Sequence, residues 1–311
     1  PPMPSTRRRF LKTIPLAASG LAVAPHLRGT SSRTPSIRLA HLTDIHLTTS
    51  STSVSGLVKA LEVVHDLDPL PDLIVQGGDL IMDALDEDKD RVQAYWRTVR
   101  DTFDTHARIP VAHCIGNHDV YGWGRRSTRN DPMYGKDWAL DEMGLAERFR
   151  RFDLGPWSFI VLDSSHHVKG GYTARLDGDQ MDWLREELDR IPAERPVCLI
   201  SHIPILATCV FFDGDLLNRS NNWEVPGAWM HTDAIELKDL FHRHPNVRLA
   251  LSGHIHLHDA VEYLGVKYLC NGAVSGAWWG GDYQEFPPGL VVVDLFEDGS
   301  SDHRFVAYQQ I

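Results

Sequence analysis

Five short apolar runs in this chain each stop at a cluster of polar side chains, and this pattern constrains the fold more than any other feature. One run, 109–115, breaks at a glycine and continues as Asn117-His118-Asp119. The other four have the same construction and end in Leu42-Thr-Asp-Ile-His46, Gln76-Gly-Gly-Asp79, Leu199-Ile-Ser-His202 and Leu251-Ser-Gly-His-Ile-His256. Short β-rich runs bounded in this way predict strands. We therefore expect five strand ends that bear chemistry and meet at one site.

The segments between these runs predict an α/β fold, with a single domain over 37–311. The expected strands are 37–42, 73–75, 109–115, 157–162, 197–200 and 247–251, and they alternate with expected helices at 54–67, 91–106, 180–191 and 233–242. This alternation is typical of βαβ units. Beyond residue 259 only strands are expected, at 261–264, 266–269, 290–295 and 304–308. Strands without helices suggest that a second sheet packs on the first.

Two local signals and two irregular segments complete this reading of the chain. Asp233 and Glu236 form an Asp-x-x-Glu signature, which predicts a capped start of the last helix. Leu264-Gly265 predicts a hairpin turn. The segments 121–150 and 203–230 follow no period, and long irregular segments beside polar strand ends are usually functional or else disordered.

Charge and cysteine content exclude some classes of function. A formal net charge of −11 over 311 residues argues against a nucleic-acid polymer or an anionic membrane as a partner, because such binders present excess Lys and Arg. The four cysteines form no Cys-x-x-Cys pair, so neither a zinc knuckle nor a disulfide framework is indicated. Buried thiols are the expectation. Only Cys209 lies in a loop-like stretch, and one disulfide stays open.

The first 24 residues resemble a twin-arginine export signal. The residues that match its Arg-Arg-x-Phe-Leu-Lys core are Arg7, Arg8, Phe10, Leu11 and Lys12. The apolar run that follows, 14–24, ends in small residues, is too short to span a bilayer, and precedes no cysteine for a lipid anchor. The resemblance implies transport by the twin-arginine translocation machinery, a flexible linker at 25–36, no stable membrane anchor, and a periplasmic or extracellular location.

The polar clusters supply seven candidate metal ligands: Asp44, His46, Asp79, Asn117, His202, His254 and His256. Two pairs among them are spaced two residues apart, so in a regular strand each pair would share one face. Oxygen and nitrogen ligands without thiolate suit Mn, Fe or Zn. Seven ligands exceed the four of one tetrahedral site. We therefore expect two ions that share one bridging carboxylate.

The order Asp-x-His, Gly-Asp, Gly-Asn-His-Asp, His and Gly-His-x-His is similar to that of the calcineurin-like metallophosphoesterase family. The resemblance implies a two-sheet sandwich flanked by helices, in a four-layer α/β/β/α arrangement. It implies one ion on Asp44, His46, Asp79 and His256, and a second ion on Asp79, Asn117, His202 and His254. His118 would lie beside the ions without binding them.

Two-metal chemistry then suggests a mechanism. Two cations lower the pKa of a bridging water and clamp the attacking and leaving oxygens of an in-line displacement at phosphorus. His118 is the expected general acid for the leaving alkoxide, and Asp119 is expected to support it. In many relatives an acidic residue three positions after the Gly-Asp aspartate orients this histidine, but here that position is Met82 and Asp83 follows it. Either Asp83 substitutes, or His118 is held in another way.

Substrate recognition is expected from residues in the irregular segments and near the C-terminus. The candidates are Tyr121, Trp123, Tyr134, His166 and Trp278, which either line a cleft or pin loops to the core. Arg125, Arg126 and Arg129 form the one local basic cluster, which solvation explains equally well. Because the aromatic loops offer stacking surfaces, we favour a phosphodiester or nucleotide-type substrate. A phosphomonoesterase or pyrophosphate-cleaving enzyme is the alternative, and a non-catalytic metal-binding scaffold is a more remote one.

Overall fold

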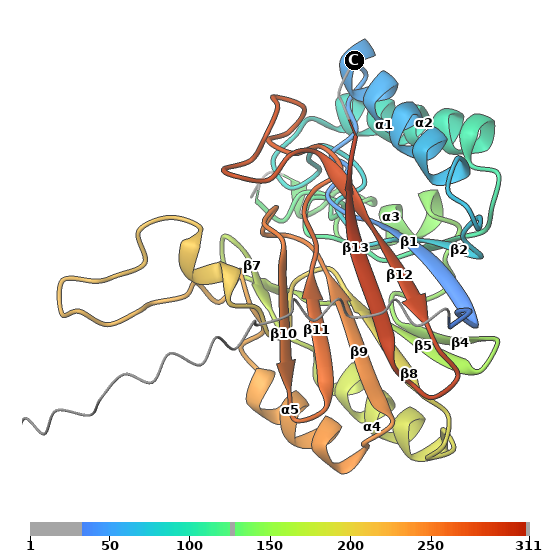
Figure 1. The fold of residues 1–311 in the computed structure, drawn as a ribbon. Coiled ribbons are helices and arrows are strands. Elements are labelled where there is room, and N and C mark those ends of the chain that lie inside the picture. The colour runs from blue at the N-terminus through green and yellow to red at the C-terminus, as the bar shows by residue number, and fades with distance from the viewer. Residues whose placement is uncertain (1–32, 125–127, 309–311) are drawn as a thin grey trace, which may run out of the picture. The chain divides into compact units, whose positions relative to one another are not determined.

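Two β-sheets packed face to face form the centre of the fold (Figure 1). The computed structural model describes residues 33–124 and 128–308. The first sheet has the order β13-β12-β1-β2-β3, with β1 at Ile37–Leu42, β2 at Leu73–Gln76, β3 at Val111–His113, β12 at Gly289–Leu295 and β13 at Ser301–Ala307. The second has the order β10-β11-β9-β8-β5-β4, with β4 at Arg150–Leu154, β5 at Trp157–Leu162, β8 at Val197–Ser201, β9 at Val247–Ser252, β10 at Asp259–Tyr263 and β11 at Val266–Cys270.

Helices cover the outer face of each sheet. Helices α1 (Ser51–His65) and α2 (Lys89–His106) pack on the first sheet, and α4 (Gly178–Arg190) and α5 (Ala234–Arg243) pack on the second (Figure 1). A third buried cluster fills the space between the sheets. The predicted two-sheet sandwich flanked by helices is therefore confirmed.

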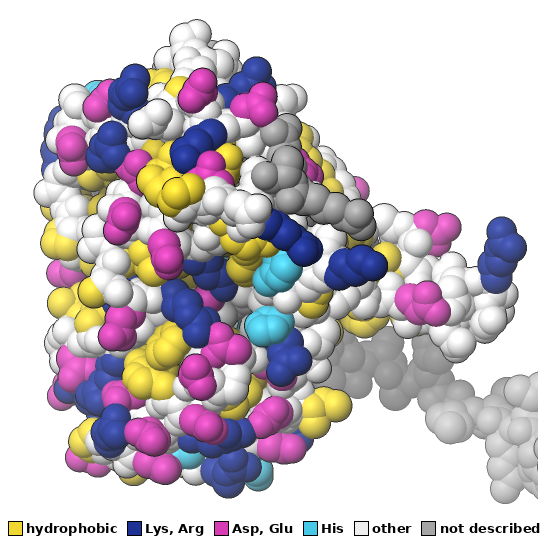
Figure 2. Space-filling model, turned by 180° about the vertical axis from the view of Figure 1, so that it is seen from behind, with side chains coloured by type: hydrophobic (Ala, Val, Ile, Leu, Met, Phe, Trp, Pro, Cys, Tyr) yellow, Lys and Arg dark blue, Asp and Glu magenta, His cyan; other side chains and the backbone are white. Residues whose placement is uncertain are grey.

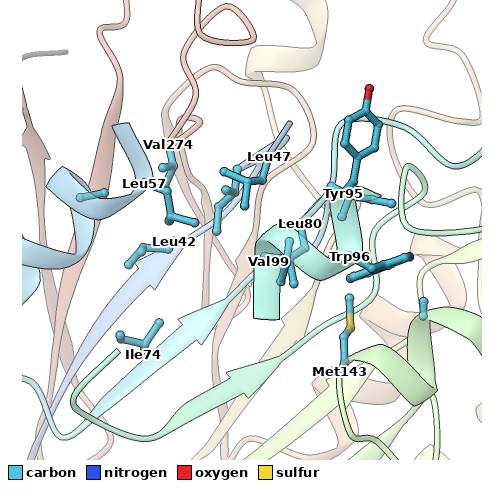
Figure 3. Packing of buried hydrophobic residues seen from close by; sticks show 14 of the residues in the cluster. Leu42, Leu47, Leu57, Ile74, Leu80, Tyr95, Trp96, Val99, Met143 and Val274 are labelled. Atoms are coloured by element: carbon cyan, nitrogen blue, oxygen red, sulfur yellow. The ribbon is translucent and has the colours of Figure 1, made fainter. Parts of the chain in front are cut away.

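Alternation along single strands assigns side chains to these layers. In β1, Leu39 faces the space between the sheets, whereas Leu42 belongs to the cluster beneath α1 and α2 (Figure 3). In β5, Phe159 faces inward and Ile160 packs under the helices of the second sheet. Successive strand residues point to opposite faces, and both faces are covered here. This is why these strands read as continuous apolar runs and not as an alternating pattern.

The topology brings the polar strand ends together. Strands β1, β2 and β3 are parallel, as are β5, β8, β9 and β11. The carboxyl ends of parallel strands lie at one edge of a sheet, where α/β proteins usually place their ligands. Each predicted polar cluster follows one of these strands directly. Both sheets thus contribute side chains to one edge of the sandwich.

Several elements escape prediction from sequence pattern. The segment 121–150 contains the short helix α3 (Asp137–Glu142), and 203–230 contains one 3₁₀ turn, η2 (Cys209–Phe212). The hairpin of β6 (Ser165–Val168) and β7 (Gly171–Ala174) and the edge strand β4 were not expected. These strands are polar or glycine-containing and only partly buried, so they lack the apolar alternation that identifies a strand.

The two local signals have different outcomes. Leu264 and Gly265 have φ angles of 51° and 84° and form the β10–β11 hairpin turn, as expected. Helix α5 begins after Asp233, but that side chain makes no capping hydrogen bond. It instead accepts from the Leu176 amide at 2.8 Å and contacts His231 Nδ1 at 2.9 Å. The predicted capping box is therefore wrong, because tertiary partners take the carboxylate.

Other expectations concern the chain outside these layers. The proposed export signal, 1–24, and residues 25–32 of the proposed linker lie outside the described residues, as do Arg125 and Arg126. Within the described part of the chain, no helix combines the length and the apolar character needed to cross a membrane. The four cysteines are buried free thiols. On the face seen in Figure 2, Lys and Arg side chains are interspersed with Asp and Glu.

Candidate metal centre

Backbone geometry at the strand ends turns the candidate ligands toward one another. Five of the seven have left-handed φ angles: Asp44 at 54°, His46 at 48°, Asp79 at 52°, His254 at 73° and His256 at 62°. Such a conformation costs a residue other than glycine about 1–3 kcal/mol and is concentrated at functional sites. Close approach also requires glycine beside these ligands. A Cβ at Gly116 would lie 2.1 Å from Asp79 Oδ1.

Asp44, His46 and His256 form the first candidate metal-binding group. Their ligand atoms lie within 4.8 Å of one another. The Nε2 atoms of the two histidines are 3.1 Å apart, and Asp44 Oδ1 lies 3.5 Å from His256 Nε2. Asp44 Oδ1 is buried without a hydrogen-bond partner, whereas Oδ2 accepts from the His254 amide at 2.9 Å. A buried, unpartnered carboxylate oxygen between two imidazoles fits a cation.

Asp79, His202 and His254 form the second group. Asp79 Oδ2 lies 3.1 Å from His202 Nε2, and Asn117 Oδ1 lies at the same distance from that nitrogen. Asp79 Oδ2 is also 3.7 Å from His46 Nε2 of the first group. This carboxylate oxygen therefore lies between the two groups, where a bridging ligand is expected. All seven candidate ligands are brought together.

Backbone carbonyls orient three of these imidazoles. The Nδ1 atoms of His46, His202 and His256 lie 3.4, 2.9 and 2.8 Å from the carbonyl oxygens of Met82, Gly77 and Gly276, respectively. A histidine whose Nδ1–H donates to a carbonyl presents its Nε2 lone pair to a metal. The outer contacts thus select the tautomer that ligation requires.

Burial and the Asp79 carboxylate shift the pKa values at this site in opposite directions. Burial lowers the pKa of His254 to about 3, with the neighbouring His202 contributing in the same direction. For His202, burial acts to lower the pKa, but the Asp79 carboxylate outweighs it and raises the pKa to about 9. Burial would raise the pKa of Asp79, yet the surrounding imidazoles hold it well below its usual range. Asp79 is thus an anion stabilised by cationic neighbours, a role that metal ions can also fill.

His118 lies beside both groups and contacts the predicted substitute for its acidic partner. Its Nδ1 is 3.2 Å from Asp83 Oδ1, and its ring is 5.1 Å from that of His46. The side chain is 31% exposed, in contrast to the buried ligands. Burial lowers its pKa, but the Asp79 and Asp83 carboxylates raise it above the ordinary value overall. Of the two alternatives left open by the sequence, the contact with Asp83 is the one observed.

Asp119 contacts backbone amides instead of His118. Its Oδ1 accepts from Leu80 and Ile81 at 2.8 and 3.2 Å, and its Oδ2 accepts from Gly116 at 2.8 Å. Burial, with a contribution from Asp79, raises its pKa to about 7. The side chain therefore ties the loop that follows β2 to the loop that bears His118. This is a positioning role and not a contact with reacting atoms.

A pocket of about 180 Å³ lies over both groups. It is lined by His46, Asp79, His118, Asp213, Trp229, His254, Ile255, His256, Trp278 and Tyr283. The Trp278 ring lies 4.5 Å from that of His256 and is 44% exposed. Sequence reasoning missed Asp213, Trp229 and Tyr283. Asp213 and Trp229 lie in the irregular segment 203–230, and Tyr283 lies between two expected strands; neither position shows which side chains face a site.

The other predicted substrate residues lie elsewhere. Tyr121 is buried in the core, with its ring 5.1 Å from that of Trp138. Trp123 and Tyr134 contact His167, the first with ring centroids 5.2 Å apart and the second with its hydroxyl 3.2 Å from Nε2. His166 pairs with Thr173 in the β6–β7 hairpin. None of the four predicted residues is among those that line the pocket over the metal groups.

Comparison with known proteins decides the family. A model of the calcineurin-like phosphoesterase family matches residues 37–258, which is most of this chain. The chain belongs to this family. The matched region of the phosphoesterase contains every candidate metal ligand as well as His118. Trp278 and Tyr283, which line the pocket, lie beyond its end.

Several relatives of the phosphoesterase have assigned activities. A 3′,5′-cyclic-nucleotide phosphodiesterase of Nostoc sp. is 26% identical over 85% of this chain and 90% of its own length. The 3′,5′-cyclic adenosine monophosphate phosphodiesterase CpdA of Escherichia coli is 25% identical over 75% of this chain and 74% of its own length. A dimetal phosphatase from Danio rerio shares the fold, with a TM-score of 0.59 at 14% identity, over 88% of this chain and 100% of that one.

Proposed function

We propose that this phosphoesterase hydrolyses a phosphodiester, and that its substrates are 3′,5′-cyclic nucleotides or similar diesters. The observation that carries the metal-dependent part of the proposal is the position of Asp79 Oδ2, 3.1 Å from His202 Nε2 in one group and 3.7 Å from His46 Nε2 in the other. A carboxylate oxygen that lies between two candidate metal-binding groups is the arrangement expected of a dinuclear centre. Mn, Fe or Zn would suit these ligands.

In this proposal Asp44, His46, Asp79 and His256 hold one ion, and Asp79, Asn117, His202 and His254 hold the other. When bound, the ions would supply a hydroxide at neutral pH and neutralise charge on the phosphoryl oxygens. The chain's own contribution to the reaction is a proton. As the phosphorus–oxygen ester bond breaks, His118 gives the proton on Nε2 to the departing oxygen, while Asp83 holds Nδ1 at 3.2 Å.

Two observations support a diester substrate with an aromatic group. The two sequence relatives named above are cyclic-nucleotide phosphodiesterases. In addition, Trp278 exposes 44% of its surface at the edge of the metal pocket, and a base can stack on such a ring. A phosphomonoesterase or pyrophosphate-cleaving activity and a non-catalytic scaffold remain as outcomes that experiment must exclude.

The test is hydrolysis by metal-free protein reconstituted separately with Mn, Zn, Fe and Mg. Each form is assayed with 3′,5′-cyclic AMP and with a matched pair, p-nitrophenyl phosphate and bis(p-nitrophenyl) phosphate. We expect higher kcat/KM for the diesters. Activity on the monoester alone would favour the phosphomonoesterase. A fully metal-loaded protein that cleaves none of these substrates would favour the scaffold.

We also propose export by the twin-arginine route, which would place the enzyme in the periplasm or outside the cell. The proposal rests on Arg7, Arg8 and the short apolar run after them. Cell fractionation of the full chain tests it. Wild type should be recovered outside the cytoplasm, and the double variant Arg7→Lys, Arg8→Lys should accumulate inside. Equal distribution of the two proteins would contradict this proposal.

A further inference from the structure

The pocket over the metal groups has an unusual charge balance for a site that receives phosphate. Among its described lining residues are two carboxylates, Asp79 and Asp213, and neither Lys nor Arg. Asp79 is accounted for by the two metal-binding groups. Asp213 belongs to neither group and comes from the irregular segment 203–230, directly after η2. Its presence requires a separate explanation.

Neighbouring side chains hold Asp213 in place. The Tyr283 hydroxyl donates to its Oδ1 at 2.7 Å, and Gln284 Nε2 donates to the same oxygen at 3.3 Å. The Tyr283 ring is 5.4 Å from that of His256 and 5.5 Å from that of Trp278, so the pair lies on the side of the first metal group. Burial, followed by the hydrogen bond to Asp213, raises the pKa of Tyr283 to about 12. The tyrosine is therefore a neutral donor at physiological pH.

No positive side chain offsets Asp213 in the described structure. Its hydrogen bonds come from a neutral phenol and a neutral amide, and no Lys or Arg of the described residues forms an ion pair with it. A substrate approaching the metal groups thus passes the Asp213 carboxylate, which none of the described Lys or Arg side chains neutralises. The charge is only partly exposed, so solvent screens it incompletely.

Such a charge acts differently on the two classes of phosphoester. A diester carries one negative charge, whereas a monoester with a second pKa near 6 carries about two at pH 8. Repulsion by Asp213 is therefore about twice as large for a monoester as for a diester in the same position. The difference also applies to the product, because hydrolysis of a diester generates a monoester.

We propose that Asp213, held by Tyr283, is a specificity-determining residue that selects monoanionic diesters over dianionic monoesters and weakens binding of the monoester product. The proposal rests on the phosphodiesterase function proposed above and extends it to the charge of the substrate. Asp213 contacts neither metal-binding group and is not assigned a part in bond cleavage.

The test compares Asp213→Asn with Asp215→Asn at pH 8. Both variants remove one carboxylate from the same segment, but Asp215 is exposed and is not among the residues that line the pocket. The kcat/KM ratio of bis(p-nitrophenyl) phosphate to p-nitrophenyl phosphate should fall about three- to tenfold in Asp213→Asn, as expected for one screened charge–charge interaction. Inhibition by 5′-AMP should strengthen by a similar factor. Asp215→Asn should match wild type in both measurements.

Metal content and a salt series complete the design. Each variant is first shown to bind as much metal as wild type. Raising NaCl from 50 mM to 1 M should lower the diester preference of wild type and have less effect on Asp213→Asn, because salt screens the same charge that the substitution removes. The salt series on wild type also tests the proposal if the variant fails to fold.

The possible failures are distinguishable. Wild type that hydrolyses neither ester would overturn the proposed function. Active wild type whose diester preference and 5′-AMP inhibition are unchanged in Asp213→Asn would overturn only the role of Asp213. An equal change in Asp215→Asn would overturn it as well, because the effect would then come from the net charge of the segment.

Discussion

At the scale of single residues, His118 differs from the histidines around it in the partner of its Nδ1. His46, His202 and His256 direct Nδ1 at backbone carbonyls, whereas His118 directs it at the carboxylate of Asp83. A neutral carbonyl fixes a tautomer for ligation, while a carboxylate stabilises the protonated ring. The outer contacts therefore distinguish His118, the proposed general acid, from three of the four histidines proposed as ligands.

Replacement of His118 by alanine should remove the proton donor without removing the ions. We expect kcat for the diester to fall by about 10²- to 10⁴-fold, the usual contribution of a general acid. Metal content, measured by elemental analysis, should equal that of wild type. His167→Ala, which removes a histidine that does not line the pocket, is the control and should keep its activity. Loss of metal from the His118 variant would contradict its assignment as a non-ligand.

Replacement of Asp119 by alanine should destabilise the fold. The variant leaves the amides of Leu80, Ile81 and Gly116 buried without their acceptor, and each unmade bond of this kind costs about 1–3 kcal/mol. Urea unfolding of the metal-free protein should show a loss of about 3 kcal/mol or more. Asp101→Ala, at an exposed position of α2, should change stability by less than about 0.5 kcal/mol. Equal losses of stability in the two variants would contradict the positioning role of Asp119.

The sequence predicted some of these residues well and others not at all. Asp44, His46 and the other candidate ligands follow short apolar runs within a few residues, so their convergence follows from strand ends meeting at one edge. Asp213 and Tyr283 meet through a contact between two irregular segments about seventy residues apart. No periodicity relates such segments. The same reason explains why Trp123 and Tyr134, equally plausible from the sequence, do not line the metal pocket.

At the scale of elements, α1 supports the site through one tryptophan. Trp279 donates from Nε1 to the His46 carbonyl oxygen at 2.9 Å, and its ring lies so close to Gly56 that a Cβ there would approach it to 2.1 Å. Its neighbour Trp278 lines the pocket instead. The sequence left open whether such aromatic residues line a cleft or pin a loop. Trp278 lines the pocket, whereas Trp279 pins the loop that bears His46.

Replacement of Gly56 by alanine tests this support. Alanine ordinarily stabilises a helix interior by about 1 kcal/mol relative to glycine, but here the new methyl group would displace Trp279 and with it the His46 backbone. We expect metal affinity to fall about tenfold or more, as for other losses of outer-shell support. Titration of metal-free protein with Mn measures the change. Ser55→Ala, on the exposed side of α1, should leave the affinity unchanged, and an unchanged Gly56 variant would refute the link.

Strands were predicted correctly where both of their faces are buried, and they were missed where a strand is only partly buried. Strands β1 and β5 have the predicted bounds. Both faces of each strand are buried, so the apolar run has the same limits as the strand. Strand β4 has the sequence Arg-Arg-Phe-Asp-Leu and lies at a sheet edge. Its charged side chains can remain solvated there, so the strand lacks the apolar pattern by which strands are predicted. The Asp233 carboxylate shows a related limit, since a local capping signature cannot reveal a competing tertiary partner.

At the scale of the whole molecule, the site joins the two sheets. Asp44 and Asp79 follow strands of the first sheet, whereas His202, His254 and His256 follow strands of the second. Each metal-binding group draws ligands from both. Ions bound there would therefore cross-link the layers of the sandwich at one edge, and metal binding should stabilise the native state as a unit.

Removal of the metal should lower thermal stability of the entire domain. A ligand at about 100 times its Kd contributes about 2.7 kcal/mol per site, so we expect chelation to lower Tm by several degrees and added Mn to restore it. Calorimetry of wild type with and without chelator gives the shift. Asp44→Ala, which lacks one ligand, should gain less from Mn. A Tm that does not respond to Mn would contradict ion binding at this site.

The left-handed backbone at five of the candidate ligand positions sets the stability of the fold against the binding of ions. A side chain other than glycine is strained there by about 1–3 kcal/mol, so replacement of Asp44 or His254 by glycine would relieve strain while destroying a ligand. The metal-free protein with Asp44→Gly or His254→Gly should therefore be more stable than wild type while lacking one candidate ligand. The five strained side chains thus lower the stability of the metal-free fold, and bound ions would offset that loss.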